Sequence, residues 1–153
     1  MKRIVVLTIV LLLTAGLSAC GGKKEMDINA FVQQVMKTVE YDDNLIEPSE
    51  RAIRDFYGFP LEGLEQYVIY VSGTMSTANE LAVMKLGDHK AVEAAKQAVT
   101  KRLADQRSNY ENYNPEELFR LDKALIEVKD NYLLFSVSND NDTVKKLFTD
   151  SFR

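Results

Sequence analysis

The sequence predicts a single α+β domain with a mainly antiparallel, four-stranded sheet built from two ββα units, helices on one face of the sheet, and further helices added at the N-terminal side. Three observations predict this fold. Two pairs of strand-like segments occur, a segment of helical periodicity follows each pair, and no Pro-, Gly- or Ser-rich linker divides residues 27–153. One domain is therefore expected over residues 27–153.

Two helices are predicted before the first strand. Apolar residues recur at helical spacing over residues 28–39, and Asp27 stands at the position of an N-terminal cap. A shorter helix is predicted over residues 49–57, ending at Gly58. Residues 41–47 between the two helices include Asp42, Asp43 and Glu47. This acidic stretch is predicted to form a solvated loop, with a weak cation site as the alternative.

The first ββα unit follows. Residues 64–72 are rich in β-branched and aromatic side chains and are apolar on both alternating faces, which is typical of an interior strand. Residues 80–86 are predicted as its antiparallel partner. From Asp88 the period changes to 3.6, which predicts an amphipathic helix to about Asn109 whose apolar face lies on the sheet.

The second unit begins with a hairpin. Residues 124–129 alternate in polarity, Asp130-Asn131 forms a two-residue turn, and residues 132–138 return. A closing helix is predicted from about Asp142, and a short helix is predicted to start at Asn114-Pro115. The two hairpins are expected to share one sheet, whose strand order the sequence leaves open.

The N-terminal segment has a cationic start and an apolar run, which lead to Leu-Ser-Ala-Cys at residues 17–20. This pattern resembles the lipobox of bacterial lipoproteins, in which the cysteine sulfur is joined to a diacylglycerol. The resemblance implies that residues 1–19 are a cleaved lipoprotein signal peptide, that Cys20 is lipidated, and that residues 20–26 form a tether. The alternative is an uncleaved signal anchor.

The expected location is the cell membrane, where diacylglycerol on Cys20 anchors the protein at the extracytoplasmic face. The apolar run is shorter than the roughly 20 residues that a spanning helix needs, whereas two acyl chains suffice for stable anchoring. Loss of Lys2 and Arg3 would change the formal net charge from −4 to −6. Such an acidic domain is a poor match for nucleic acid, so no nucleic-acid partner is predicted.

A further likeness to a known family covers residues 27–152. Five segments carry it: residues 67–73, 78–83, 101–106, 113–116 and 128–138. They include Tyr-Val-Ile-Tyr-Val-Ser-Gly, Ala-Asn-Glu-Leu-Ala-Val, Lys-Arg-Leu with Gln106, and Tyr-Asn-Pro-Glu. On these residues the chain resembles a family of small Gram-positive bacterial lipoproteins catalogued as a domain of unknown function. The resemblance implies a cell-surface lipoprotein and supplies no activity and no site residue.

No catalytic residue, metal site or cofactor is predicted. His89 is the only histidine and Cys20 the only cysteine, so neither a zinc site nor a histidine-based triad can be assembled. Residues 139–142, Asn-Asp-Asn-Asp, lack the glycine and the distant glutamate of an EF-hand loop and are interpreted as a turn and helix cap.

The candidate ligand or partner loop lies between the first two strands and consists of Ser72, Gly73, Thr74, Ser76 and Thr77. Its hydroxyls and backbone N–H groups suit an anion or a sugar, and recognition residues often lie on loops over a rigid scaffold. An ordinary exposed turn is the alternative.

A second candidate is a surface patch of Tyr110 and Tyr113 with Asn112 and Asn114, with packing at the edge of the core as the alternative.

Two functions remain open at this point. The first is a non-enzymatic binding or interaction module that contacts a cell-envelope protein or polymer. The alternative is a small solute-binding lipoprotein or a hydrolase, with a carboxylate- and hydroxyl-lined cleft formed by the candidate loop near Glu80. The identity of the ligand and the oligomeric state are not predicted.

Overall fold

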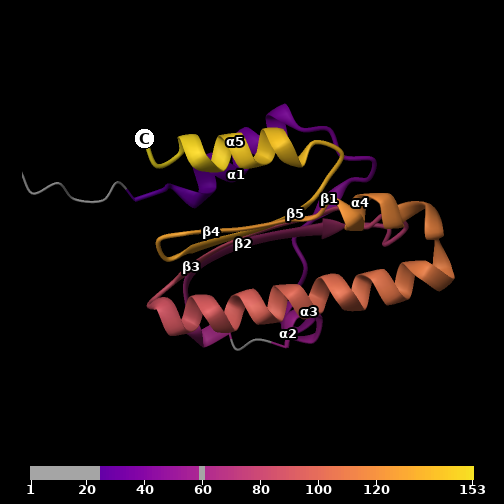
Figure 1. Ribbon diagram of the computed structural model, residues 1–153, viewed down its shortest axis with the longest axis horizontal. Coiled ribbons are helices and arrows are strands. Elements are labelled where there is room, and N and C mark those ends of the chain that lie inside the picture. Colours follow the sequence, from indigo (N-terminus) through magenta and orange to yellow (C-terminus); the bar gives the residue numbers. More distant parts are fainter. Residues whose placement is uncertain (1–24, 59–60) are drawn as a thin grey trace, which may run out of the picture.

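The computed structural model describes residues 25–58 and 61–153 and shows a five-stranded antiparallel sheet between two layers of helices (Figure 1). The strand order is β1-β2-β3-β5-β4. The strands are β1 (Leu45–Ile46), β2 (Leu64–Ser72), β3 (Glu80–Leu86), β4 (Leu125–Lys129) and β5 (Tyr132–Val137).

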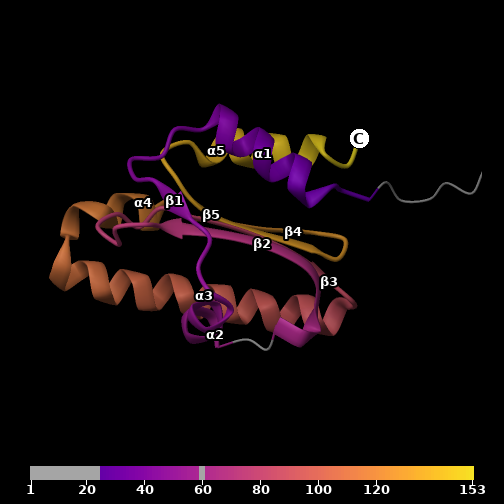
Figure 2. The ribbon, with the colours of Figure 1, turned by 180° about the vertical axis from the view of Figure 1, so that it is seen from behind.

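The helices lie on both faces of the sheet. On one side are α1 (Ile28–Thr38) and α5 (Asn141–Asp150), and on the other are α2 (Glu50–Tyr57) and α3 (His89–Tyr113), as both views show (Figures 1 and 2). Three short helical segments complete the described residues: η1 (Leu61–Gly63), η2 (Pro115–Glu117) and α4 (Leu118–Asp122).

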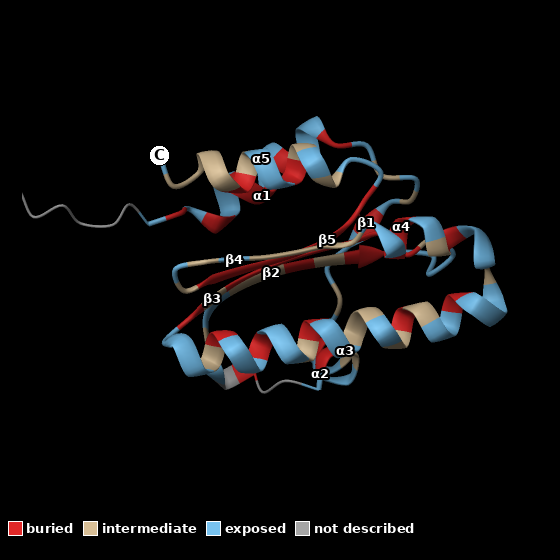
Figure 3. Ribbon diagram, viewed as in Figure 1, coloured by how far each residue is buried: buried red, intermediate tan, exposed pale blue. Residues whose placement is uncertain are grey.

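The α+β class is confirmed, but the prediction that the helices lie on one face is wrong. The reason is the central strands, since β5 is buried along its whole length and β3 along all but one residue (Figure 3). A strand that is apolar on both alternating faces needs cover on both sides. Two separate core clusters result, one under α2 and α3 and one under α1 and α5.

The sheet also has one strand more than predicted. β1 pairs with the end of β2, with Leu45 opposite Ser72 and Ile46 opposite Val71. It lies in the stretch that sequence reasoning assigned to a solvated loop. Two residues are too few to produce a recognisable alternation, so the pairing had no periodic signal in the sequence.

The remaining elements agree closely with the sequence, because their ends carry strong local signals. The predicted cap Asp27, and Ser49 and Asp88 at the predicted starts of the next two helices, each accept a hydrogen bond from a backbone N–H of the first helical turn. Asp140 does the same for α5, which confirms the cap interpretation of residues 139–142. Gly58 ends α2 in the left-handed region with φ of 59°.

Cys20 and residues 1–19 lie outside the described residues, so signal-peptide cleavage and lipidation stay predictions. Within residues 25–58 and 61–153, no helix has both the length and the apolar character required to cross a bilayer.

Candidate functional site

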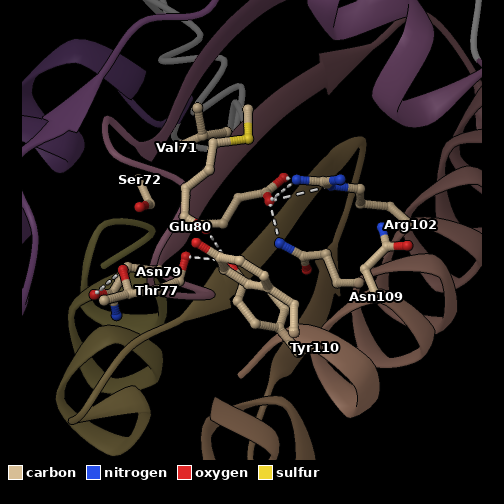
Figure 4. A pocket seen from close by; sticks show the side chains of 11 residues that line it. Val71, Ser72, Thr77, Asn79, Glu80, Arg102, Asn109 and Tyr110 are labelled. Atoms are coloured by element: carbon tan, nitrogen blue, oxygen red, sulfur yellow. Dashed lines mark hydrogen bonds and ion pairs between the residues drawn. The ribbon is translucent and has the colours of Figure 1, made fainter. Parts of the chain in front are cut away.

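A buried carboxylate lies at the start of β3. Glu80 is 0% exposed, and its two oxygens accept hydrogen bonds from Tyr57, Arg102 and Gln106. Arg102 Nη2 and Gln106 Nε2 are each 2.8 Å from Glu80 Oε2, and the Tyr57 hydroxyl donates to Oε1. Figure 4 shows Glu80 and Arg102 converging from β3 and α3.

Regular periodicity brings these side chains together. In β3 every second residue faces α3, so Glu80 lies on the same side of the strand as Ala82 and Met84 of the core. Arg102 and Gln106 are four residues apart in α3 and therefore share a helix face. Tyr57 is the last residue of α2, which packs beside α3.

The environment shifts the pKa of two groups that contact Glu80, the Tyr57 hydroxyl and the Arg102 guanidinium. Burial and the adjacent Glu80 carboxylate raise the pKa of Tyr57 well above its usual value, so its hydroxyl remains a donor. Burial, the largest single influence, lowers the pKa of Arg102, but the charge of Glu80, the hydrogen bond to it, and Tyr57 and Tyr110 together raise that pKa above its usual value. The Arg102 guanidinium also lies over the Phe56 ring, 4.3 Å from its centroid.

A pocket of about 150 Å³ opens beside this ion pair, between the ends of β2 and β3 and the C-terminal half of α3 (Figure 4). Glu80, Arg102 and Gln106 supply polar groups. Its other lining residues are Val71, Ser72, Met75, Thr77, Asn79, Asn109, Tyr110 and Tyr113.

The rim of the pocket is partly apolar and exposed. Met75 is 55% exposed and Tyr113 is 72% exposed. Met75 has a φ of 59°, which is uncommon for a residue with a side chain. Tyr110, in contrast, is 8% exposed and its hydroxyl donates to the backbone oxygen of Thr77. Of the two predicted tyrosines, one is therefore at the core edge and the other on the surface.

The predicted ligand loop forms one wall of this pocket. Ser72 and Thr77 line it, whereas Thr74 and Ser76 bond to each other at its outer side. The backbone N–H of Gly73 donates to the Asn44 oxygen at 2.9 Å, which joins the loop to β1. Ligand binding by this loop stays a prediction.

The loop hydroxyls are held from within the protein. Ser72 Oγ donates to Asp43, and the Thr74 hydroxyl and backbone N–H donate to the same carboxylate at 2.6 and 3.0 Å. These hydrogen bonds, that of Ser72 first, lower the pKa of Asp43 to about 2. Asp43 belongs to the acidic stretch that the sequence analysis placed in solvent.

A second buried ion pair lies on the other side of the loop. Arg120 donates to both oxygens of Glu117 and to Asp42, and its Nε donates to Asn139 Oδ1 at 2.7 Å. Glu117 in turn accepts from the Ala78 backbone N–H at 2.8 Å. Sequence reasoning found neither ion pair; the available signals were Glu80 beside the apolar run 81–84 and Arg120 between Phe119 and Leu121.

Among the described residues, no group of three or more His, Cys, Asp or Glu side chains is arranged to hold a metal ion. His89 is exposed in the first turn of α3. The pocket's chemistry therefore comes from one internally paired carboxylate, amide groups, hydroxyls and apolar walls.

A family model described as a domain of unknown function (DUF4358) matches residues 37–138, two thirds of the chain. The chain belongs to this family. No curated protein and no solved structure matches the chain. The DUF4358 region contains every residue that lines the pocket, whereas most of α1 and all of α5 lie outside it. The resemblance to a family of unknown function is confirmed.

Proposed function

We propose that this DUF4358 protein is a membrane-anchored, extracytoplasmic lipoprotein that acts as a non-enzymatic binding module at the cell envelope. The anchor is diacylglycerol on Cys20, supported by the Leu-Ser-Ala-Cys sequence after an apolar run. A cell-envelope protein or polymer is the expected partner.

The engagement of Glu80 is the observation that favours binding over catalysis. A general acid or base must exchange a proton with a group on the substrate. Both Glu80 oxygens are already occupied by donors from Tyr57, Arg102 and Gln106. The carboxylate therefore serves to hold α2 and α3 against the sheet beside an open pocket.

The pocket hydroxyls lack the adjacent base that a hydrolase nucleophile requires. A serine or threonine hydroxyl needs an adjacent base that takes its proton. Ser72 donates to Asp43, a carboxylate whose pKa of about 2 makes it a weak base at neutral pH. Thr77 donates to the side-chain oxygen of Asn79, which is an amide.

Binding of a small solute is the second candidate, and the pocket favours it. Sites for drug-sized ligands usually measure 300–1,000 Å³, whereas this pocket measures about 150 Å³. Such a volume suits a small molecule or one side chain of a partner.

The anchor is tested by fractionation of cells that carry Cys20→Ala. The variant is expected in the soluble extracytoplasmic fraction, because the sulfur that accepts the lipid is gone. Gly22→Ala, two residues away, is the matched control and should remain with the membrane. Retention of Cys20→Ala in the membrane would contradict the lipid anchor.

The binding role is tested by photocrosslinking in intact cells. A crosslinkable residue at position 113, on the exposed pocket rim, is expected to give a discrete adduct with an envelope component. The same residue at Gln34, exposed on α1, is the control and should not give that adduct. Equal labelling from both positions would contradict a binding site at the pocket.

A further inference from the structure

We propose that the outer edge of β2 binds an extended segment of a partner protein, which joins the sheet antiparallel to β2 and places a lysine or arginine against Glu47 and Glu50. This site is separate from the pocket beside Glu80, and its chemistry does not depend on the lipid anchor. The proposal goes beyond the proposed function because it specifies the conformation and the charge of a partner.

The edge of β2 is only partly covered. β1 pairs with Val71 and Ser72 alone, and among the described residues no other strand pairs with β2 on that side. Along the uncovered part, Glu65 and Gln66 are exposed and Tyr67 is half-buried. A strand edge with unpaired backbone groups is a template for a further strand.

The backbone of Tyr67 is directed away from β3. The N–H of Gly73 donates toward β1, to the Asn44 oxygen at 2.9 Å, whereas the N–H of Ser72 donates toward β3. Backbone groups of neighbouring residues in a strand point alternately to its two sides. The register with β3 is unbroken over residues 66–71, so Tyr67 shares the direction of Gly73. Its N–H and C=O can therefore exchange a pair of hydrogen bonds with an added strand.

A proline explains why β1 ends early. Ile46 lies opposite Val71, and continuing this register would place Pro48 opposite Ile69. Proline has no backbone N–H and cannot donate to the strand ladder. The chain turns from the sheet edge into α2 instead (Figure 2). The protein's own strand thus stops where a partner's strand can begin.

A groove of about 250 Å³ lies at this point of the edge. Its β2 side is lined by Tyr67, Val68 and Ile69, and its other side by Glu47, Pro48 and Glu50. Ile53 and Ile69 are 4% and 3% exposed and give the groove an apolar base. An extended segment can therefore place an apolar side chain in the groove while its backbone pairs with Tyr67.

The charge of the groove favours a basic segment. Glu47 and Glu50 are the two charged residues among those that line it, and both are exposed. Glu47 accepts a hydrogen bond from an uncharged group, the Tyr70 hydroxyl, at 2.6 Å. Glu50 has Arg54 Nη2 at 3.8 Å, near the outer limit for an ion pair. A lysine or arginine at the groove would gain an attraction that an acidic residue would lose.

The position of the glutamates also indicates the direction of the segment. A strand antiparallel to β2 runs in the direction of β1, so its N-terminal end lies near Pro48. A basic residue at that end is therefore beside Glu47 and Glu50. Addition of an extended segment to a free sheet edge is a recurrent mode of peptide recognition.

The test is an NMR titration of the full chain in detergent with the peptide acetyl-Lys-Val-Thr-Val-Thr-Val-amide. The amide signals of Tyr67 and Val68 should shift saturably, and hydrogen exchange at Tyr67 should slow. A peptide with glutamate in place of lysine should bind about ten-fold more weakly, because repulsion replaces attraction.

Two further peptides test the backbone pairing. One is N-methylated at its valines and the other at its threonines. Because alternate N–H groups of a strand face the same neighbour, one of the two should bind about ten-fold more weakly than the parent peptide, through loss of a hydrogen bond.

Variants of the protein assign the contact. Tyr67→Pro removes only the N–H that points away from β3, so it should weaken binding of the lysine peptide about ten-fold and leave the ladder with β3 intact. Tyr67→Ala is the matched control, because it loses the same side chain and keeps the N–H.

A charge variant covers the case in which Tyr67→Pro fails to fold. Glu47→Gln with Glu50→Gln should abolish the preference for the lysine peptide over the glutamate peptide. Glu111→Gln with Glu116→Gln removes two exposed carboxylates remote from the groove and should leave the preference intact.

The outcomes separate this inference from the proposed function. Equal binding of the lysine and glutamate peptides would overturn the charge preference, and full binding of both methylated peptides would overturn the backbone pairing. Shifts of the Tyr67 signal on protein dilution alone would show that a second copy of the chain occupies the edge instead. If no peptide shifts this signal, the edge does not bind a strand. The crosslink from position 113 tests the pocket independently of all these results.

Discussion

The two faces of the sheet are built differently. Under α1 and α5 the core is dominated by apolar and aromatic side chains, with Phe148 in edge-to-face contact with Phe31 and Phe152 at centroid distances of 5.8 and 5.3 Å. Under α2 and α3, a charged pair, Glu80 and Arg102, is buried beside an open pocket. The first face buries the hydroxyls of Tyr41 and Tyr132, whereas the second buries two opposite charges.

The difference shows which face carries binding chemistry. Replacing a buried ion pair by apolar side chains of similar volume is often neutral or stabilising. The Glu80–Arg102 pair is therefore poorly explained by stability alone, and both of its residues line the pocket. On the other face, α1 and α5 cover the sheet with a second apolar core.

The largest effect is expected from Phe148→Ala on the closed face. Phe148 is 1% exposed, and removal of a buried phenyl ring lowers the free energy of unfolding by about 3–5 kcal/mol. Urea denaturation measures the loss, and Met36→Ala, at a position 37% exposed on α1, is the control with a much smaller change. Because the sheet separates the two faces, folded Phe148→Ala should still give the crosslink from position 113. Loss of that crosslink in a folded variant would contradict the independence of the faces.

A loss of about 3 kcal/mol is expected from Arg102→Met, because it leaves the Glu80 carboxylate buried without its cation. Arg51→Met, with a side chain 93% exposed, is the control and should change stability by less than about 1 kcal/mol. The double variant Glu80→Leu, Arg102→Met should recover much of the loss. Strictly additive effects in this cycle would show that the two residues are not energetically coupled.

Gly73→Ala should lower the free energy of unfolding by about 2 kcal/mol, through overpacking against β1. An added Cβ would lie 2.8 Å from the Asn44 backbone oxygen, which β1 holds in place. Gly87→Ala is the matched control, since its nearest contact would be an ordinary 3.7 Å to Glu65. Equal stability of the two variants would mean that the backbone at Asn44 moves aside for the added methyl group at little cost in free energy.

The smallest effect concerns pH and Asp43. The pKa of Asp43 is lowered from 3.8 to about 2, so its contribution to stability is present above pH 4 and is lost as the pH falls toward 2. Asp43→Asn should therefore have a shallower loss of stability between pH 4 and pH 2 than the parent. Asp55→Asn is the control for removal of an exposed carboxylate. Parallel stability curves for Asp43→Asn and the parent would contradict the account of the loop.

The sequence predicted most elements because their signals are local. β2 and β3 were predicted with the bounds that the structure shows, and α2 ends at Gly58 as expected. Strand β1 was not predicted because its two residues, Leu45–Ile46, are too few to show a periodicity. The second helical layer was missed because apolar residues on both faces of β5 were not used to require cover on both sides.

The site was predictable only in part, because it depends on contacts distant in sequence. The loop beginning at Ser72 and its nearness to Glu80 were expected, and both belong to the pocket. In an amphipathic helix a charged residue such as Arg102 is expected on the face away from the sheet, since charge normally indicates solvent exposure. Its partner lies 22 residues away in sequence, and no local pattern indicates such a pairing.

The most direct test of the account is photocrosslinking in intact cells from the two faces of the sheet. We expect a discrete adduct with an envelope component from position 113, on the exposed pocket rim, and none from Gln34 on α1. Equal labelling from the two positions, or no adduct from position 113, would contradict the account.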